Sequence, residues 1–253
     1  MPILDPTTRF SSRVANYVRY RPGYPPEVLQ TLKSECGLTS AAVIADAGSG
    51  TGLLARLFLE NQNRVYGIEP NKEMREAGET VLQEFFRFVS VAGTAEDTTL
   101  PEHSVDFVTA GQSAHWFDAG KARQEFARIL RPGGWIVFVW NDRSTDATPL
   151  LIAIEHLLSS YCPEYRDALR EGNERVKAFF APAPVSVKTF PSRQEFDYAG
   201  LEGRLLSSSY APLEDHPSHV PMLKELRAIF DHYQSNGRVV FERATTMFYA
   251  RIP

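Results

Sequence analysis

A short apolar segment that ends in a carboxylate and then breaks into alternate glycines constrains this chain more than any other feature. Residues 43–52 read VIADAGSGTG, and apolar residues at helical spacing follow from Leu53 to Phe58. This pattern predicts a strand, a tight glycine turn and a helix. Glycines in such a turn let a ligand approach the backbone and the amino end of the helix. The segment therefore predicts the first unit of a nucleotide-binding α/β fold.

The spacing of the glycines separates two kinds of nucleotide site. A dinucleotide-binding turn has the pattern G-x-G-x-x-G, in which the third glycine allows close packing of helix on strand. Here the pattern that starts at Gly48 is G-x-G-x-G, and Leu53 stands where the dinucleotide pattern has glycine. Residues 64–69 predict a second strand that ends in Glu69. A carboxylate at that place can accept hydrogen bonds from both hydroxyls of a ribose.

Taken together, Asp46, the glycine pattern and Glu69 make the chain similar to the class I S-adenosylmethionine-dependent methyltransferases. Their first motif is an acid followed by G-x-G-x-G, and their second is an acid at the end of the next strand. The resemblance covers residues 17–141 motif by motif, and residues 142–253 in pattern only. It implies an α/β fold with a doubly wound, mostly parallel sheet of seven strands and an antiparallel last strand. The alternation of strands and helices, followed by a final strand pair, favours the same sheet.

The resemblance also implies how S-adenosylmethionine would be bound. The glycine turn would hold the methionine part, Asp46 would orient the turn or the amino group, and Glu69 would bind the ribose. Thr94 stands where family members often have aspartate, so it keeps an oxygen near the adenine but loses the charge. The expected cofactor-binding residues are Tyr20, Arg21, Asp46, Gly48, Ser49, Gly50, Gly52, Glu69, Pro70, Thr94, Ala95, Glu96 and Gln112.

The segment after the fourth strand is where the methyl acceptor should lie. Residues 111–117 read GQSAHWF and lack the N-P-P-Y-like element of enzymes that methylate exocyclic amines in nucleic acids or glutamine. His115 is the candidate catalytic base, which a phenol or alcohol needs and an ionised carboxylate does not. A structural role for His115 and Trp116 is the alternative. The expected acceptor-site residues are Tyr24, His115, Trp116, Trp140 and Arg143.

Two segments outside the central motifs are expected to close the site within one domain, residues 1–253. Residues 8–36 form the expected lid, whose R-P-x-Y-P stretch is similar to that of methyltransferases resembling trans-aconitate methyltransferase. Residues 144–184 form an expected helical insertion, with helices at 148–160 and 164–180, that roofs the acceptor pocket. Further helices are expected at 71–85, 118–130 and 217–234, a turn at 131–134, and strands at 185–190 and 241–252.

Composition excludes several classes of partner. The net charge is −4 without a basic block, which favours neither nucleic acid nor an anionic membrane. Cys36 and Cys162 are isolated, so neither a zinc site nor a disulfide framework is indicated, and no metal is expected. No leader or membrane span is evident, which predicts a cytoplasmic protein with a small-molecule methyl acceptor. The oligomeric state is left open.

Two other functions remain open from the sequence. One is an NAD(P)-dependent oxidoreductase, against which Leu53 and the lack of a recognisable Tyr-x-x-x-Lys both count. The other is a non-catalytic protein that binds S-adenosylmethionine, because methyl transfer demands no fixed acid or base. The favoured function is methyl transfer to an oxygen of a small organic acid.

Overall fold

The computed structural model describes residues 14–143, 148–163, 165, 176 and 178–251. Their strands form one seven-stranded sheet in the order β3-β2-β1-β4-β5-β7-β6. The strands are β1 (Val43–Ala47), β2 (Arg64–Ile68), β3 (Phe88–Val91), β4 (Val105–Gly111), β5 (Leu130–Arg143), β6 (Ser186–Phe196) and β7 (Val239–Ala250). The first five strands run parallel, whereas β7 lies between β5 and β6 and is antiparallel to both. The expected fold class is confirmed.

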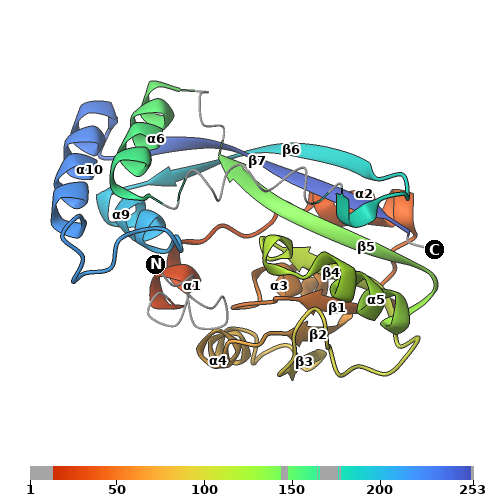
Figure 1. The fold of residues 1–253 in the computed structure, drawn as a ribbon. Coiled ribbons are helices and arrows are strands. Elements are labelled where there is room, and N and C mark those ends of the chain that lie inside the picture. Colours follow the sequence, from red (N-terminus) through yellow and green to blue (C-terminus); the bar gives the residue numbers. More distant parts are fainter. Residues whose placement is uncertain (1–13, 144–147, 164, 166–175, 177, 252–253) are drawn as a thin grey trace.

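Helices follow the strands on both faces of this sheet (Figure 1). Asn71 caps α4 and Asp118 caps α5, because each side chain accepts backbone N–H groups of the first turn. Gly37 ends α2 at a φ of 70°, which glycine adopts without a steric penalty. The helices are α1 (Val14–Tyr20), α2 (Glu27–Cys36), α3 (Leu53–Glu60), α4 (Lys72–Val81), α5 (Ala119–Ile129), α6 (Pro149–Tyr161), α9 (Tyr198–Leu206), α10 (His219–Tyr233) and the 3₁₀ helix η2 (Ala114–Trp116).

Three boundaries differ from the expected ones. Helix α4 ends at Val81 instead of residue 85, with Leu82 as its C-cap. The expected turn at 131–134 lies inside β5, because Leu130 already pairs with Val105 before the register shifts and Trp135 pairs with Phe107. Strand β6 continues to Phe196 instead of residue 190, and β7 runs from Val239 to Ala250 instead of from residue 241 to residue 252, so the two strands pair with each other over residues 186–196.

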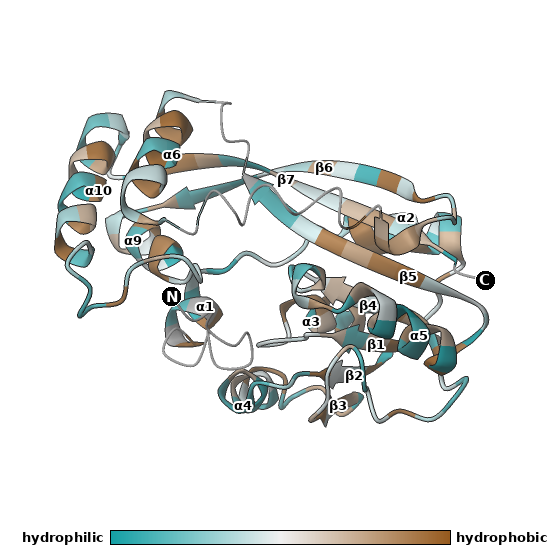
Figure 2. Cartoon of the chain, viewed as in Figure 1, coloured by the Kyte–Doolittle hydropathy of each residue, from teal (hydrophilic) through white to brown (hydrophobic). Residues whose placement is uncertain are grey.

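Two hydrophobic cores cover the two faces of the parallel sheet. Phe126 of α5 packs with Phe138 and Phe248 on one face, and α2 and α3 pack against strand residues such as Val137 on the other. In Figure 2 the buried part of β5 is largely hydrophobic, whereas α10 alternates between hydrophilic and hydrophobic residues. Amphipathic helices therefore close a sheet whose central strands are apolar on both faces.

A third core lies where β6 and β7 extend beyond the other strands (Figure 1). It is formed by α6, α9 and α10 with Phe196 and Phe241 of the two strands. The expected helical insertion is therefore one part of a larger helical layer that also draws on residues 198–233. Most of the expected helix at 164–180 lies outside the described residues. A roof over the acceptor pocket stays a prediction.

None of the described helices is both long enough and apolar enough to cross a membrane.

Candidate active site

The glycine turn between β1 and α3 adopts a backbone conformation that only glycine holds easily. Gly48, Gly50 and Gly52 have φ values of 65°, 56° and 83°. A Cβ atom on Gly48 would lie 2.6 Å from the Cβ of Ser113, and one on Gly52 would lie 2.4 Å from a methyl carbon of Leu82. Ser113 and Leu82 thus pack closely against the turn. The backbone of residues 48–52 forms a concave surface, the glycine cradle, at the carboxyl ends of the parallel strands.

Glu69 at the end of β2 holds this cradle in place. Its carboxylate accepts the Gly50 N–H through Oε2 at 2.8 Å and the Asn71 N–H through Oε1 at 2.9 Å. The residue is 8 % exposed, and burial raises the pKa of Glu69 although both backbone hydrogen bonds oppose the shift. Each oxygen keeps lone pairs for further donors, which is the property that ribose binding requires. The adjacent Pro70 is exposed.

Asp46 lies beneath the turn and carries an unsatisfied oxygen. It is 1 % exposed, its Oδ1 accepts the Thr109 hydroxyl at 2.9 Å, and its Oδ2 has no hydrogen-bond partner. Burial raises the pKa of Asp46 to about 7, against an ordinary value of 3.8. An orphaned carboxylate oxygen below the cradle suits a buried cation or a backbone N–H that becomes available when a ligand is bound.

Asp46→Asn is expected to change how stability depends on pH. Folded wild-type protein holds a proton on Asp46 that the unfolded chain releases, so its stability falls as pH rises from about 3.8 to about 7. The asparagine variant lacks this contribution. Urea unfolding across that range, without ligand, should therefore show a shallower decline for Asp46→Asn than for wild type. Asp97→Asn, on an exposed turn, is the control and should follow wild type. Parallel pH profiles for all three proteins would contradict the placement of the proton.

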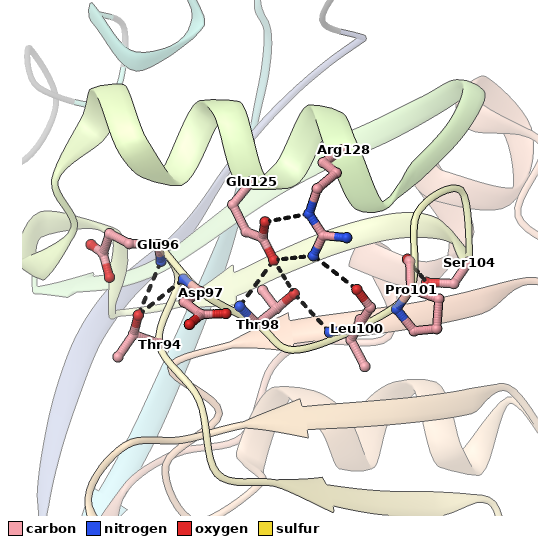
Figure 3. Close-up of polar contacts among 9 residues, drawn as sticks. All are labelled: Thr94, Glu96, Asp97, Thr98, Leu100, Pro101, Ser104, Glu125 and Arg128. Carbon is pink, nitrogen blue, oxygen red and sulfur yellow. Dashed lines mark hydrogen bonds and ion pairs between the residues drawn. The ribbon is translucent and has the colours of Figure 1, made fainter.

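The loop after β3 is anchored to α5 through Glu125, which also forms an ion pair with Arg128 on the same helix (Figure 3). Glu125 accepts the Thr98 N–H at 3.0 Å and the Thr98 hydroxyl at 2.5 Å, and Arg128 donates to both of its oxygens at 2.6 and 2.7 Å. Although burial opposes it, these hydrogen bonds hold the pKa of Glu125 below its ordinary value. Sequence reasoning missed Glu125, whose position on α5 carries no local signal of a contact 27 residues away.

Inside this loop the expected adenine-binding residues already make local contacts. The Thr94 hydroxyl oxygen accepts the N–H groups of Glu96 at 3.2 Å and Asp97 at 3.1 Å (Figure 3). Ala95 is buried, and Glu96 accepts the Asp118 N–H at 2.8 Å. Thr94 therefore shapes the turn, and its contact with a ligand stays a prediction.

At the carboxyl end of β4 the chain turns sharply into η2. Gln112 has a φ of 60°, which is uncommon for a residue with a side chain and often marks functional sites. Its side-chain amide donates to the Asn141 carbonyl at 3.0 Å. In η2 the rings of His115 and Trp116 are half-buried. Their centroids lie 4.6 Å apart, and the angle between the ring planes is 43°. Ser113, which precedes η2, packs against Gly48, so the loop that carries His115 and Trp116 begins beside the glycine cradle.

The described part of the expected lid contacts both the parallel part of the fold and the helical layer formed by α6, α9 and α10. Helix α1 contacts α4 and α9. The Tyr20 ring lies on Gly203 of α9, where an added Cβ would come within 2.1 Å of the ring. Arg21 donates to the Ser207 hydroxyl at 3.1 Å and to the Ser207 carbonyl at 3.0 Å. Both expected cofactor residues therefore face the helical layer, and binding of the methionine carboxylate by either one stays a prediction.

The three remaining acceptor candidates have different surroundings. A Cβ on Gly111 would lie 2.5 Å from the Tyr24 hydroxyl oxygen, so Tyr24 reaches the end of β4. Trp140 is 7 % exposed and packs edge to face with Phe138 and Phe248, which gives it a place in the core. Arg143 ends β5, but its side chain is outside the described part. Ligand contacts of all three stay predictions.

An open cavity of about 400 Å³ lies at the other edge of the sheet. It is lined by residues at the amino ends of β4 and β5, including Asp106, Arg131 and Trp135, and by Cys36. None of the expected site residues lines it. Arg131 and Asp106 form an ion pair of 2.8 Å there. Ligands of open α/β sheets bind at the carboxyl ends of the strands, so this cavity is not the candidate active site.

Comparison with known proteins finds similarity in the segment that contains the glycine turn and Glu69. Residues 45–138 match the family described as "Methyltransferase domain". An uncharacterised methyltransferase of Mycobacterium tuberculosis is 38 % identical over 139 residues, which are 55 % of this chain and 54 % of the relative. The chain thus spans about half the length of the curated relatives it matches.

Solved structures extend the likeness over the whole fold. A protein of Anaeromyxobacter dehalogenans, provisionally named a type II methyltransferase, covers 92 % of this chain and 98 % of its own, with a TM-score of 0.66 and 22 % identity. A phosphoethanolamine N-methyltransferase of Haemonchus contortus, in complex with phosphomonomethylethanolamine and S-adenosylhomocysteine, covers 99 % of this chain and 59 % of its own (TM-score 0.57, 15 % identity). Residues 45–138 are therefore similar to a methyltransferase domain, and the chain has the fold of the class I S-adenosylmethionine-dependent methyltransferases.

Proposed function

We propose that the protein transfers a methyl group from S-adenosylmethionine to an oxygen of a small organic acid. The observation that supports this most is the pairing of the glycine cradle with Glu69, whose carboxylate is fixed against the cradle at 2.8 Å. Glu69 would accept the ribose hydroxyls, and the turn from Gly48 to Gly52 would face the methionine part. The orphaned Oδ2 of Asp46 fits a cofactor that carries an ammonium group.

When bound, S-adenosylmethionine supplies a methyl group on a positively charged sulfur, and an acceptor oxygen displaces the sulfur in line. The protein's share in such a reaction is to align the two reactants and to exclude water. The loop of Gln112, His115 and Trp116 leaves β4 directly beside the cradle, which suits it to hold the acceptor. A carboxylate is already ionised and needs no base, whereas a phenol would depend on His115.

The choice of a small acid rests on three observations. The net charge is −4 and the sequence has no block of basic residues, which does not favour nucleic acid as the acceptor. The loop after β4 lacks the N-P-P-Y-like element of amine-modifying enzymes. Arg243 lies on the part of β7 that pairs with the end of β5, and Arg21 lies in the expected lid. The planar guanidinium of an arginine suits a carboxylate. Amine or carbon acceptors are the alternatives that these observations do not favour.

Two rival functions are separated by one set of measurements. A non-catalytic protein would bind S-adenosylmethionine without turnover, and an oxidoreductase would bind a nicotinamide dinucleotide. We expect calorimetric titration to give binding of S-adenosylmethionine and S-adenosylhomocysteine but no comparable affinity for NAD or NADP. Tight binding of a nicotinamide cofactor in place of the sulfonium would overturn the proposal.

The product is expected to be a methyl ester, which alkali hydrolyses. Methyl-labelled cofactor incubated with panels of small polycarboxylates, phenols and peptides should label the carboxylates, and mild alkali should release the label as methanol. A phenol ether or a methylated amine would keep the label. Labelled product that resists alkali, or that forms only with a protein or nucleic-acid acceptor, would contradict a carboxylate acceptor.

A further inference from the structure

Arg243 on β7 is a buried cation for which the described residues supply no counter-ion. It is 6 % exposed, and its only described side-chain hydrogen bond runs from Nη1 to the Gln194 side-chain oxygen at 3.1 Å. Its Nε is buried and has no acceptor. Within the described part of the chain, no carboxylate lies at ion-pair distance from it. The cross-strand neighbour on β6, Ser192, likewise has a buried hydroxyl without a partner.

The surroundings of this guanidinium add positive charge instead of balancing it. Burial first, and then the charge of Arg21, lower the pKa of Arg243 to about 10, with an opposite effect from Tyr24. Arg21 and Tyr24 come from the lid, and Gln194 and Ser192 come from β6. An arginine buried without a counter-ion destabilises the folded state, and an apolar residue of similar size would avoid the cost. A ligand that carries a negative charge would supply the missing counter-ion and would explain why an arginine is buried here.

The position of Arg243 connects it to the candidate active site. On β7 the buried face carries Phe241, Arg243, Thr245 and Met247, and it passes from the core of the helical layer to that of the main sheet. Thr245 donates to the Asn141 side-chain oxygen at 2.6 Å. The Asn141 carbonyl in turn accepts the Gln112 amide at the end of β4. Arg243 precedes Thr245 by two residues on the same face of β7, so their Cα atoms are separated by about 7 Å along the strand.

We propose that Arg243 binds an anionic group of the methyl acceptor, a carboxylate in the acid proposed above. This inference rests on the proposed function for the identity of its ligand. The Arg243 guanidinium would donate through Nε and its free terminal N–H groups, and Ser192 would donate its hydroxyl. A planar guanidinium matches a carboxylate through two parallel hydrogen bonds. Arg243 is thereby a specificity-determining residue that selects acids from neutral molecules of the same shape.

The test compares Arg243→Gln with the control Arg193→Gln on the exposed side of β6. Each protein, saturated with S-adenosylhomocysteine, is titrated with succinate and citrate, and with succinamide as a neutral probe. We expect wild type and Arg193→Gln to bind at least one carboxylate and not the amide. Arg243→Gln should lose at least tenfold in that affinity, as befits a charge-assisted hydrogen bond. Affinity for S-adenosylhomocysteine should stay within about twofold of wild type in all three proteins.

A second variant, Arg243→Met, separates a ligand-binding arginine from a structural one. Methionine fills the volume without a buried charge, so its ligand-free unfolding temperature should equal or exceed that of wild type. A lowered unfolding temperature in Arg243→Met, or a carboxylate affinity that is equal in wild type and Arg243→Gln, would overturn the inference. So would failure of wild type to bind either carboxylate. Weakened S-adenosylhomocysteine binding in Arg243→Gln would assign the site to the cofactor's own carboxylate and also overturn it.

These outcomes are distinct from those of the proposed function. Label transfer to an acceptor whose KM is unchanged in Arg243→Gln would leave methyl transfer standing and overturn the role of Arg243. Carboxylate binding that depends on Arg243, in a protein that transfers no methyl group, would support the anion site and remove the enzymatic proposal.

Discussion

Glu69→Ala is expected to weaken the binding of S-adenosylhomocysteine by at least tenfold. The carboxylate would lose two charge-assisted hydrogen bonds to the ribose, each worth about 1.5–3 kcal/mol when broken. It would also lose its hold on the Gly50 N–H, so that the cradle itself is less fixed. The fold should persist because Glu69 ends a strand and its side chain is not part of a hydrophobic core. Calorimetric titration, with circular dichroism to confirm folding, measures the effect.

A ligand analogue can show how much of the lost affinity comes from the hydrogen bonds to the ribose and how much from the less fixed glycine turn. For wild type, S-adenosylhomocysteine lacking the ribose 2′-hydroxyl should bind more weakly than the parent. For Glu69→Ala the two ligands should bind alike, since the acceptor of that hydroxyl is gone. Glu84→Ala, on an exposed residue after α4, is the control. Normal affinity in a folded Glu69→Ala protein would show that another group binds the ribose.

Local signals were sufficient to predict the fold of the parallel half. Asp118 and Asn71 cap their helices, Gly37 ends α2, and the alternate glycines mark the turn after β1. Each acts over a few residues, so the physical cause is visible in the sequence. The error at 131–134 has the same origin. An Arg-Pro-Gly-Gly stretch favours a turn locally, but Leu130 already pairs with β4, and the ladder tolerates a shift in register.

The parts that could not be predicted depend on contacts between distant segments. Glu125 holds the loop after β3, and α6 packs with α9 and α10, although neither pairing leaves a periodic signal. Arg243 is a partial exception. Alternation along residues 239–249 places it among apolar residues on the buried face, where a charge is unusual. That signal is present in the sequence, because Arg243 lies inside the expected strand 241–252 and shares a face with Phe241 and Met247.

Gly48→Ala is expected to abolish measurable binding of S-adenosylhomocysteine. At a φ of 65° an alanine is strained by about 1–2 kcal/mol. In addition, its Cβ would lie 2.6 Å from the Cβ of Ser113, an atom attached directly to the backbone that has no freedom to rotate away. Either the cradle or the loop that carries His115 must therefore move. Both are expected to hold reactants, so the substitution should affect cofactor and acceptor together.

The control for this prediction is Gly133→Ala. Gly133 has a φ of 79°, but nothing lies within 4 Å of its added Cβ, and it stands at the opposite edge of the sheet. It should lose stability through backbone strain alone and bind S-adenosylhomocysteine like wild type. If both variants lose similar stability in urea unfolding and only Gly48→Ala loses the ligand, close packing of the cradle against Ser113 is the cause. If both variants lose binding equally, destabilisation of the fold is the cause. If Gly48→Ala binds S-adenosylhomocysteine normally, the ligand does not bind at the glycine cradle.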